Sequence, residues 1–386
     1  MMRNSSSRDG GGGGDSSRAG PPELRLRPFP VRSIRPRPLW EHALTGACAV
    51  GLFAAFPVFT SAFNIAVFSG LGLVSKPLLR AAGNAIRASF YRHVLIFVRD
   101  VGGTKFTLYG DLPGDENQLC ICNHQSDVDW LTITAALRPA NCDGRCAFIL
   151  KNTLKYVPMF GWFWWMSGFV YVRKSWQKDE PRIKRKLTEI AESGQNYSLI
   201  IFPEGTRYTP QKAKESLAFA HSRGLPETQH VLTPRSKGFI AAVQSLGTSL
   251  DSVYDMTIAY TSATGSYVRP EPPTLFGTVG REYNHVHIHV RRHRAADLPH
   301  NAADIDAWLR KRFEEKEALM QRFHQGYGFD GPQYELCERP WTLAGQMLLA
   351  ASSIAFLFAT KTGRRVLTAE LVLSGVVLTT AGVVFL

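Results

Sequence analysis

Short apolar runs alternate with amphipathic segments through the middle of the chain, between about residues 85 and 330. Runs of this kind are typical of buried strands, whereas apolar positions recurring every three or four residues are typical of helices. The pattern predicts strands at Val94–Val98, Gln118–Cys122, Arg145–Leu150, Gly168–Val172, Tyr197–Phe202, Met256–Tyr260 and His285–Val290. It predicts helices at Ser126–Leu137, Pro181–Ser193, Lys212–Arg223, Arg235–Leu246 and Ala303–His324. Because the two types largely alternate, we expect an α/β fold with a mostly parallel or mixed central sheet flanked by helices.

Long uncharged regions flank this central part of the chain. No charged residue occurs from Ala43 to Ser75, which is longer than the roughly 20 residues that a helix needs to span a bilayer. Pro57 divides this region, so a single kinked span and a re-entrant hairpin both fit the sequence. Trp341–Thr360 and Val366–Leu386 are each about one span long. We therefore expect a membrane-embedded helical segment at 40–78 and a transmembrane helical hairpin at 341–386.

The charge distribution points to an anionic partner. The formal net charge is +13, which favours nucleic acid, a phospholipid surface or an anionic small molecule. Residues 1–39 hold eight arginines against three acidic residues and few apolar side chains, so we expect a disordered basic tail that lies on an anionic membrane. The basic residues cluster beside apolar spans and form no known nucleic-acid-binding module, so we expect a lipid bilayer as partner and no nucleic acid.

Two features of the sequence favour opposite membrane topologies. The basic stretch from Lys361 to Arg365 lies between the two C-terminal spans, and the positive-inside rule places it in the cytosol. A full hairpin then puts the region before Trp341 on the opposite side. The six scattered cysteines instead favour a reduced, cytosol-facing protein.

No metal site is expected. Cys120 and Cys122 lie on one face of a predicted strand, and the cysteine spacings differ from the usual zinc-binding pattern. Histidines at positions 285, 287 and 289 alternate along another predicted strand, and no carboxylate pair stands nearby at ligand spacing. We interpret them as a solvated strand face.

Polar residues follow three of the predicted strands at the point where each strand ends. These clusters are Asn123 to Asp129, Arg173-Lys174, and Pro203-Glu204-Gly205-Thr206-Arg207. Reactive groups of open parallel sheets collect just beyond the carboxyl ends of the strands. If the three strands are neighbours, the clusters face one crevice.

His124 and Asp129 fit general-base chemistry. An imidazole is a base near neutral pH, and a carboxylate usually orients it through its other nitrogen. Five residues of an ideal helix rotate by about 140°, so His124 must precede the helix or lie in a distorted first turn. Helix capping explains Ser126 or Asp127, but it leaves His124 and Asp129 unexplained.

The stretch from Phe202 to Arg207 fits anion binding. Pro203 ends the strand, Gly205 lets the backbone approach a ligand, and Arg207 can hold an anion through two hydrogen bonds. Glu204 has no obvious structural role. An ordinary surface turn containing a salt bridge is the alternative.

Four motifs, in order, resemble those of the glycerolipid acyltransferases. They are Asn-His-four-residues-Asp at His124 and Asp129, Gly168 to Arg173, Phe202 to Arg207, and Val231-Leu232-Thr233-Pro234-Arg235. The fourth is similar to the form found in one branch of the 1-acyl-sn-glycerol-3-phosphate acyltransferases, which includes lysocardiolipin-acyltransferase-like members, and it lacks the double proline of the wider family. The resemblance implies an acyltransferase domain at about 85–330.

The resemblance also implies a mechanism and its residues. His124 would deprotonate the hydroxyl of a lysophospholipid, the oxygen would attack the thioester of acyl-CoA, and Asp129 would orient His124. No covalent acyl-enzyme, metal or cofactor is needed, and acyl-CoA is a substrate. The acceptor would be bound by Glu204, Gly205, Thr206, Arg207 and Arg173, and weaker contacts to the donor or headgroup would come from Lys174, Pro234 and Arg235.

The sequence and the resemblance lead to three hypotheses about the function of the protein. The first is a membrane-bound enzyme that acylates 1-acyl-sn-glycerol-3-phosphate to phosphatidic acid, in the endoplasmic reticulum or alternatively a mitochondrial membrane. The second is remodelling of a larger lysophospholipid, such as lysocardiolipin or lysophosphatidylinositol. The third is a catalytically silent, membrane-anchored lipid-binding protein, which the intact His124 and Asp129 disfavour. A serine hydrolase is disfavoured because the chain has no Gly-X-Ser-X-Gly sequence.

Two further segments keep alternatives open. The predicted helix Pro181–Ser193 carries Arg182, Lys184, Arg185 and Lys186, which suit either CoA phosphates or lipid headgroups, or form a solvated helix face. The aromatic run from Phe160 to Trp165 suits a membrane interface, an acyl tunnel or ordinary core packing.

Overall fold

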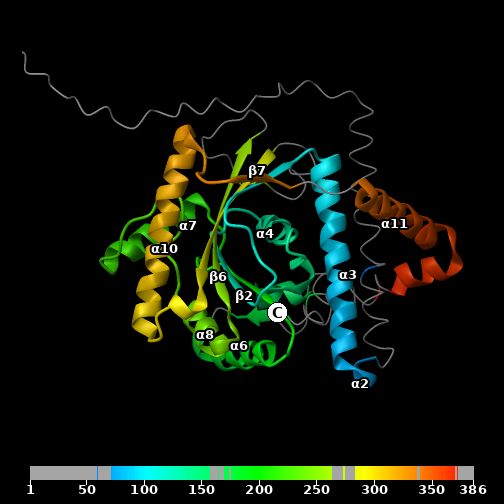
Figure 1. The fold of residues 1–386 in the computed structure, drawn as a ribbon, viewed down its shortest axis with the longest axis horizontal. Coiled ribbons are helices and arrows are strands. Elements are labelled where there is room, and N and C mark those ends of the chain that lie inside the picture. The colour runs from blue at the N-terminus through cyan, green and yellow to red at the C-terminus, as the bar shows by residue number, and fades with distance from the viewer. Residues whose placement is uncertain are drawn as a thin grey trace, which may run out of the picture.

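The computed structural model describes residues 59, 71–156, 164, 169–173, 175–262, 273, 283–336, 340–369 and 372. The basic tail at 1–39, most of the segment at 40–78, Lys174, and nearly all of the aromatic run and of the second C-terminal span lie outside these residues, so their predictions are not tested. The described part is built around one eight-stranded sheet with helices on both faces (Figure 1).

The strands lie in the order β4-β3-β5-β2-β6-β7-β1-β8. Their bounds are β1 Lys105–Gly110, β2 Gln118–Cys122, β3 Cys146–Lys151, β4 Val170–Val172, β5 Ser198–Ile201, β6 Ser252–Ser262, β7 Tyr283–Arg294 and β8 Gln333–Glu335. The five strands from β4 to β6 pair in parallel. On the other side, β7 is antiparallel to β6, β1 is parallel to β7, and β8 is antiparallel to β1. The predicted α/β fold with a mixed sheet flanked by helices is confirmed.

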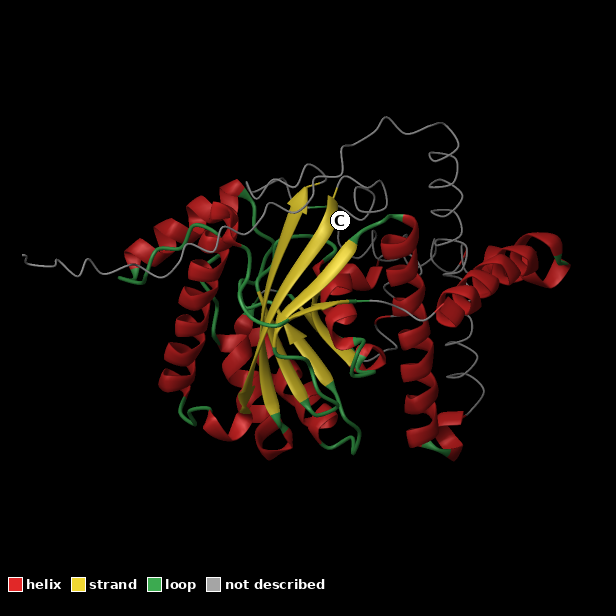
Figure 2. Ribbon diagram, turned by 45° about the horizontal axis from the view of Figure 1, so that its top comes forward, coloured by secondary structure: helices red, strands yellow, loops and turns green. Residues whose placement is uncertain are grey.

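Helices cover the sheet on both faces (Figure 2). The helices of the described part are α2 Leu71–Val74, α3 Lys76–Ile96, α4 Asp129–Leu137, α6 Trp176–Ala191, α7 Pro210–Ser222, α8 Lys237–Leu246, α10 Ala302–Arg322 and α11 Pro340–Ala359. Of these, α2 and α11 pack against α3. Shorter turns are η1 Phe97–Val101, η2 Asp143–Arg145, η3 Asn152–Tyr156, η4 Gly247–Ser249, η5 Ala295–Asp297 and η6 Phe323–Tyr327. All five predicted helices exist, with ends that differ by a few residues.

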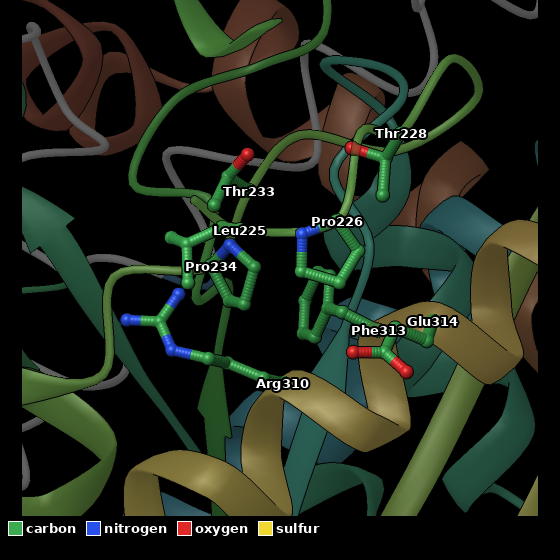
Figure 3. Close-up of a pocket in the computed structure, with 8 residues that line it drawn as sticks. All are labelled: Leu225, Pro226, Thr228, Thr233, Pro234, Arg310, Phe313 and Glu314. Atoms are coloured by element: carbon green, nitrogen blue, oxygen red, sulfur yellow. The ribbon is translucent and has the colours of Figure 1, made fainter. Parts of the chain in front are cut away.

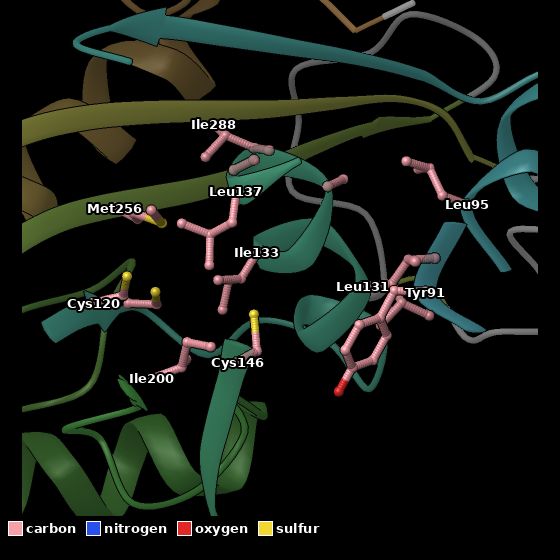
Figure 4. Packing of buried hydrophobic residues seen from close by; sticks show 14 of the residues in the cluster. Tyr91, Leu95, Cys120, Leu131, Ile133, Leu137, Cys146, Ile200, Met256 and Ile288 are labelled. Atoms are coloured by element: carbon pink, nitrogen blue, oxygen red, sulfur yellow. The ribbon is translucent and has the colours of Figure 1, made fainter. Parts of the chain in front are cut away.

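Alternating residues of β2 enter two separate hydrophobic cores. Cys120 and Cys122 pack with side chains of α3 and α4 on one face. Leu119 and Ile121 pack with side chains of α6, α8 and α10 on the other. Figure 4 shows the first core, with the Cys120 thiol among residues of α4 and of the neighbouring strands. Because β2 is covered on both faces, all of its residues after Gln118 are apolar, as expected for a central parallel strand.

The predicted strand Val94–Val98 is wrong. These residues form the last turn of α3 and the start of the π-helical turn η1. A short apolar run is compatible with a strand or with a buried helix, and this run is fully buried against the sheet. The strand beside it in sequence is β1, which the apolar pattern did not predict.

The interpretation of the β7 histidines as a solvated face is also wrong. His285, His287 and His289 are at most 8% exposed, and burial lowers the pKa values of His285 and His289 to about 4. Two of them have polar partners on β1: His285 Nε2 lies 2.7 Å from Thr107 Oγ1, and His287 Nδ1 lies 2.9 Å from the Tyr109 hydroxyl. The alternation therefore marks a buried row of histidines, of which His285 and His287 are hydrogen-bonded. Within the described part of the chain, no group of three or more His, Cys, Asp or Glu side chains is placed to hold a metal ion.

The C-terminal part is helical but bent. Among the described residues, no single helix combines the length and apolarity of a membrane span. Ala344–Ala359 and Lys361–Ala369 reach that standard only together, and they meet at an angle of 93°. The basic stretch after Thr360 therefore begins a second short helix.

Candidate active site

Two of the three predicted polar clusters meet at adjacent strand ends. β2 and β5 pair in parallel up to Ile121 and Ile201, so His124 and Glu204 leave the sheet side by side. The His124 backbone N–H donates to Glu204 Oε1 at 3.1 Å, and the His124 carbonyl accepts from the Tyr208 N–H at 2.8 Å. The imidazole stacks on the Phe202 ring with 4.3 Å between centroids. The histidine is thus held through both its backbone and its ring.

Asp129 holds the other side of the imidazole. His124 precedes α4 and Asp129 is its first residue, so the carboxylate reaches back to His124 Nδ1 at 2.8 Å. The same carboxylate oxygen accepts the backbone N–H groups of Gln125 at 2.6 Å and Ser126 at 2.9 Å. The Asp129 side chain is fully buried, whereas that of His124 is 25% exposed. An ionised carboxylate only accepts, so Nδ1 carries the proton and Nε2 is left as the basic nitrogen.

Neighbouring residues fix the end of β2. The Asn123 side chain donates to the Ile258 carbonyl at 2.9 Å and accepts the Ile258 N–H at 2.7 Å, so it binds β6 as another backbone residue would. The Ser126 hydroxyl accepts the Val128 N–H at 3.1 Å, so it stabilises the turn before α4, whose N-cap residue Val128 has no side-chain cap hydrogen bond. Asp127 has a different contact, an ion pair with Arg207.

The turn after β5 places its predicted residues on one surface beside His124. Gly205 has φ +68°, and a Cβ atom there would lie 3.4 Å from the side chain of Arg235. The Arg235 N–H donates to the Pro203 carbonyl at 2.7 Å, which brings the fourth motif against the third. Thr206 and Arg207 are half-buried in the same turn. The turn therefore carries two cationic side chains, Arg207, which pairs with Asp127, and Arg235, which lies against Gly205.

The remaining predicted residues lie farther away. Arg173 follows β4, which β3 separates from β5, so about 10 Å of sheet lies between the two strand ends. The Arg173 N–H donates to Asp179 at 2.7 Å, and its side chain is exposed. Pro234 is buried and lines a cavity of about 20 Å³ against Phe313 of α10 (Figure 3). That volume holds about one water, so Pro234 packs the fourth motif onto α10.

The comparisons with known proteins are consistent with this geometry. An acyltransferase family model matches residues 104–261, and an acyltransferase C-terminus model matches residues 278–349. The chain is 33% identical over 257 residues to mouse 1-acyl-sn-glycerol-3-phosphate acyltransferase epsilon, covering 65% of this chain and 70% of that protein. The chain belongs to the 1-acyl-sn-glycerol-3-phosphate acyltransferase family. The resemblance seen in the motifs is confirmed.

Two further similarities extend the comparison. The acyltransferase is 30% identical over 272 residues to 1-acyl-sn-glycerol-3-phosphate acyltransferase 2 of Arabidopsis thaliana, covering 69% of this chain and 68% of that protein. The crystal structure of the 1-acyl-sn-glycerophosphate acyltransferase PlsC from Thermotoga maritima has a TM-score of 0.42 and 16% identity, covering 74% of this chain and 96% of that one. A likeness that distant adds nothing to the fold or the site described above.

Tyr260 is a site residue of the acyltransferase that the sequence did not reveal. Its hydroxyl donates to the second oxygen of Asp129 at 2.5 Å and lies 3.1 Å from Thr132 Oγ1. Burial and the charge of Asp129 raise the pKa of Tyr260, so the phenol stays a donor. The only signal in the sequence was a tyrosine at the end of a predicted strand. Tyr260 is a positioning residue, because it acts on His124 through Asp129.

Replacing Tyr260 with phenylalanine is expected to lower kcat about 10- to 100-fold with both KM values unchanged. A hydrogen bond to a charged group contributes about 1.5–3 kcal/mol, and here that contribution fixes the carboxylate that orients the base. Tyr254→Phe is the matched control, because its hydroxyl also bonds a carboxylate, Glu116, at 2.5 Å, but away from the site. Equal losses of kcat in the two variants would show that Tyr260 is merely structural.

Lys316 anchors the strands beneath the site. It is fully buried on α10 and pairs with the Asp255 carboxylate of β6. Its ammonium group also donates to the Met256 carbonyl at 2.6 Å and the Ile121 carbonyl at 3.4 Å. α10 is thereby tied to β2 and β6 just before β2 ends and the chain reaches His124.

Proposed function

We propose that the protein transfers a fatty acyl group from acyl-CoA to the free hydroxyl of 1-acyl-sn-glycerol-3-phosphate, giving phosphatidic acid. The observation that carries this proposal is the partly exposed imidazole of His124, which a buried carboxylate holds through Nδ1. The relatives are named 1-acyl-sn-glycerol-3-phosphate acyltransferases, which supports an acceptor that carries a phosphate group.

The chemistry needs one base and no covalent intermediate. Nε2 of His124 takes the proton of the acceptor hydroxyl while that oxygen attacks the thioester carbonyl carbon. The new C–O bond forms, the C–S bond breaks, and the imidazolium returns its proton to the departing CoA sulfur. Asp129 stabilises the imidazolium through Nδ1–H, as the carboxylate does in other oriented histidine bases.

The acceptor phosphate is bound by Arg207 in this proposal. In a 1-acyl-sn-glycerol-3-phosphate the reactive hydroxyl and the phosphate are separated by only a few bonds, so the phosphate must lie close to His124. Arg207 meets that condition because it pairs with Asp127, three residues after His124. The incoming phosphate replaces Asp127 as its partner.

Arg207→Ala is expected to raise the KM for the acceptor about 10- to 100-fold and to leave the KM for acyl-CoA nearly unchanged, since it removes charge-assisted hydrogen bonds to phosphate. Arg207→Lys restores only part of the loss, because lysine lacks the planar fork. Asp127→Asn lowers the acceptor KM by up to about fivefold, the value of an exposed ion pair. Arg223→Ala, which removes an exposed arginine beyond the end of α7, is the control. A change confined to the KM for acyl-CoA would assign Arg207 to the donor.

Membrane attachment is part of the proposal. Large apolar side chains are exposed at α2, at the start of α3 and along α11, including Leu73 at 94%, Val74 at 85%, Leu348 at 71% and Phe358 at 54%. α2, α3 and α11 lie on the same side of the molecule in Figures 1 and 2. Exposed apolar surface of this kind typically marks a site of interaction with a protein or a membrane. In this proposal the partner is the lipid bilayer, from which the lysophospholipid acceptor reaches the site by lateral diffusion.

One experiment tests activity and attachment together. Membranes containing the protein are washed with alkaline carbonate, and the pellet and supernatant are assayed for release of free CoA with lysophosphatidic acid, lysocardiolipin and lysophosphatidylinositol. We expect activity in the pellet, highest with lysophosphatidic acid. A preference for lysocardiolipin or lysophosphatidylinositol would favour a remodelling enzyme, and no release with any acceptor would contradict acyl transfer. Activity in the supernatant would contradict integral attachment.

A further inference from the structure

A cavity of about 190 Å³ lies between β4 and α6, away from His124. Phe169 and Tyr171 belong to its β4 side, and its α6 side is formed by Arg182, Arg185, Lys186 and Glu189. The mechanism proposed above uses none of these side chains. The cavity therefore needs a different explanation from that of the catalytic cluster.

The cavity carries an excess of positive charge. Residues three or four apart lie on the same side of a helix, so the four charged side chains of α6 form one flank. Glu189 lies 3.0 Å from Lys186 and 4.0 Å from Arg185, which offsets one of the three positive charges. Arg182 forms no ion pair with any residue in the described part of the chain. A polar cavity with surplus cations is suited to a phosphate group.

Strand register places this cavity near the level of the catalytic strand ends. Val170 of β4 pairs with Ile149 of β3. The residue before Ile149, Phe148, pairs with Ile200 of β5. Val170 is therefore level with Ile201 of β5 and Ile121 of β2. Ile121 lies three residues before His124 in the sequence. Three strand spacings, about 14 Å, separate β4 from β2.

That separation distinguishes the two phosphate-bearing substrates. The phosphate of the acceptor is only a few bonds from the reacting hydroxyl, so it cannot reach a cavity beside β4 while the hydroxyl lies at His124, after β2, three strand spacings (about 14 Å) away. Coenzyme A carries its phosphates at the far end of the long pantetheine arm, beyond the reacting sulfur. On the basis of the function proposed above, we propose that the Arg182–Glu189 flank of α6 binds the 3′-phosphate of the adenosine end of acyl-CoA.

The test compares two donors, acyl-CoA and acyl-dephospho-CoA, which lacks only the 3′-phosphate. Arg182→Gln and Lys186→Gln are each expected to raise the KM for acyl-CoA about tenfold, the loss of one charge-assisted hydrogen bond. The KM for acyl-dephospho-CoA and the KM for the acceptor should stay within about twofold of the wild-type values. Inhibition by adenosine 3′,5′-bisphosphate, competitive with acyl-CoA, should weaken in both variants by a similar factor.

Lys184→Gln is the matched control. It removes the same charge from the same helix, but Lys184 does not line the cavity and pairs with Glu180 at 2.7 Å. Equal changes in KM for the two donors, a change in acceptor KM alone, or no change would overturn the proposal. Because wild-type CoA release is measured in the same assay, an active wild type with unaffected variants rejects only this site, whereas an inactive wild type rejects the proposed function.

Discussion

His124→Ala is expected to lower the rate of acyl transfer by about 10²–10⁴-fold, the usual contribution of a positioned general base, in a protein that remains folded. The fold should survive because Asp129 keeps its bonds from the Gln125 and Ser126 backbone and from Tyr260. The measurements are CoA release at saturating substrates and thermal unfolding followed by circular dichroism.

The control for this variant is His221→Ala. His221 lies in the last turn of α7, and its side chain is 85% exposed, so its loss should change neither activity nor stability. Near-normal turnover in a folded His124→Ala protein would remove His124 from the mechanism.

Lys316→Met should destabilise the protein by about 3–5 kcal/mol, because removing one member of a buried ion pair leaves the other charge buried without compensation. The group left without a partner is the carboxylate of Asp255, whose side chain is only 6% exposed. The shift is measured as the change in the free energy of unfolding by denaturant in detergent. Lys311→Met, at an exposed position of the same helix, should be close to neutral.

The double variant Lys316→Met/Asp255→Asn separates charge from packing. It removes the uncompensated carboxylate and should recover part of the lost stability. An unchanged unfolding midpoint in Lys316→Met would show that the pair contributes nothing to folding. Loss of stability that the second substitution does not relieve would assign the effect to the backbone contacts of the ammonium group.

The sequence was informative where the chemistry is local. His124 and Asp129 are five residues apart, and the turn Pro203–Arg207 is one continuous stretch, so both were recognisable before any strand order was known. The apolar runs predicted six of the eight strands, among them the five that pair in parallel, because strands covered on both faces are largely apolar. The same property caused the error at Val94–Val98, where a fully buried helix end has the same composition.

The features that were missed depend on contacts between distant segments. Nothing near Tyr260 in sequence indicates that its hydroxyl reaches Asp129, and nothing near Lys316 indicates a carboxylate on β6. The prediction of a solvated face for the β7 histidines was wrong because it also depended on a distant segment. Thr107 and Tyr109, which bond to His285 and His287, belong to β1, a strand that the pattern did not predict. Arg173 shares the sheet edge with His124, but only the strand order shows that β3 and β5 lie between them.

The position of β2 in the middle of the sheet has a consequence for the biosynthesis of the enzyme. The groups that hold His124 and its strand come from much later in the chain: Glu204 is 80 residues after His124, Tyr260 is 131 residues after Asp129, and Lys316 is 195 residues after Ile121. Long-range pairings of this kind form only once the later segments are available. A chain still emerging from the ribosome thus carries its histidine without the partners that orient it, and competence for acyl transfer is expected only when translation of the acyltransferase region is complete.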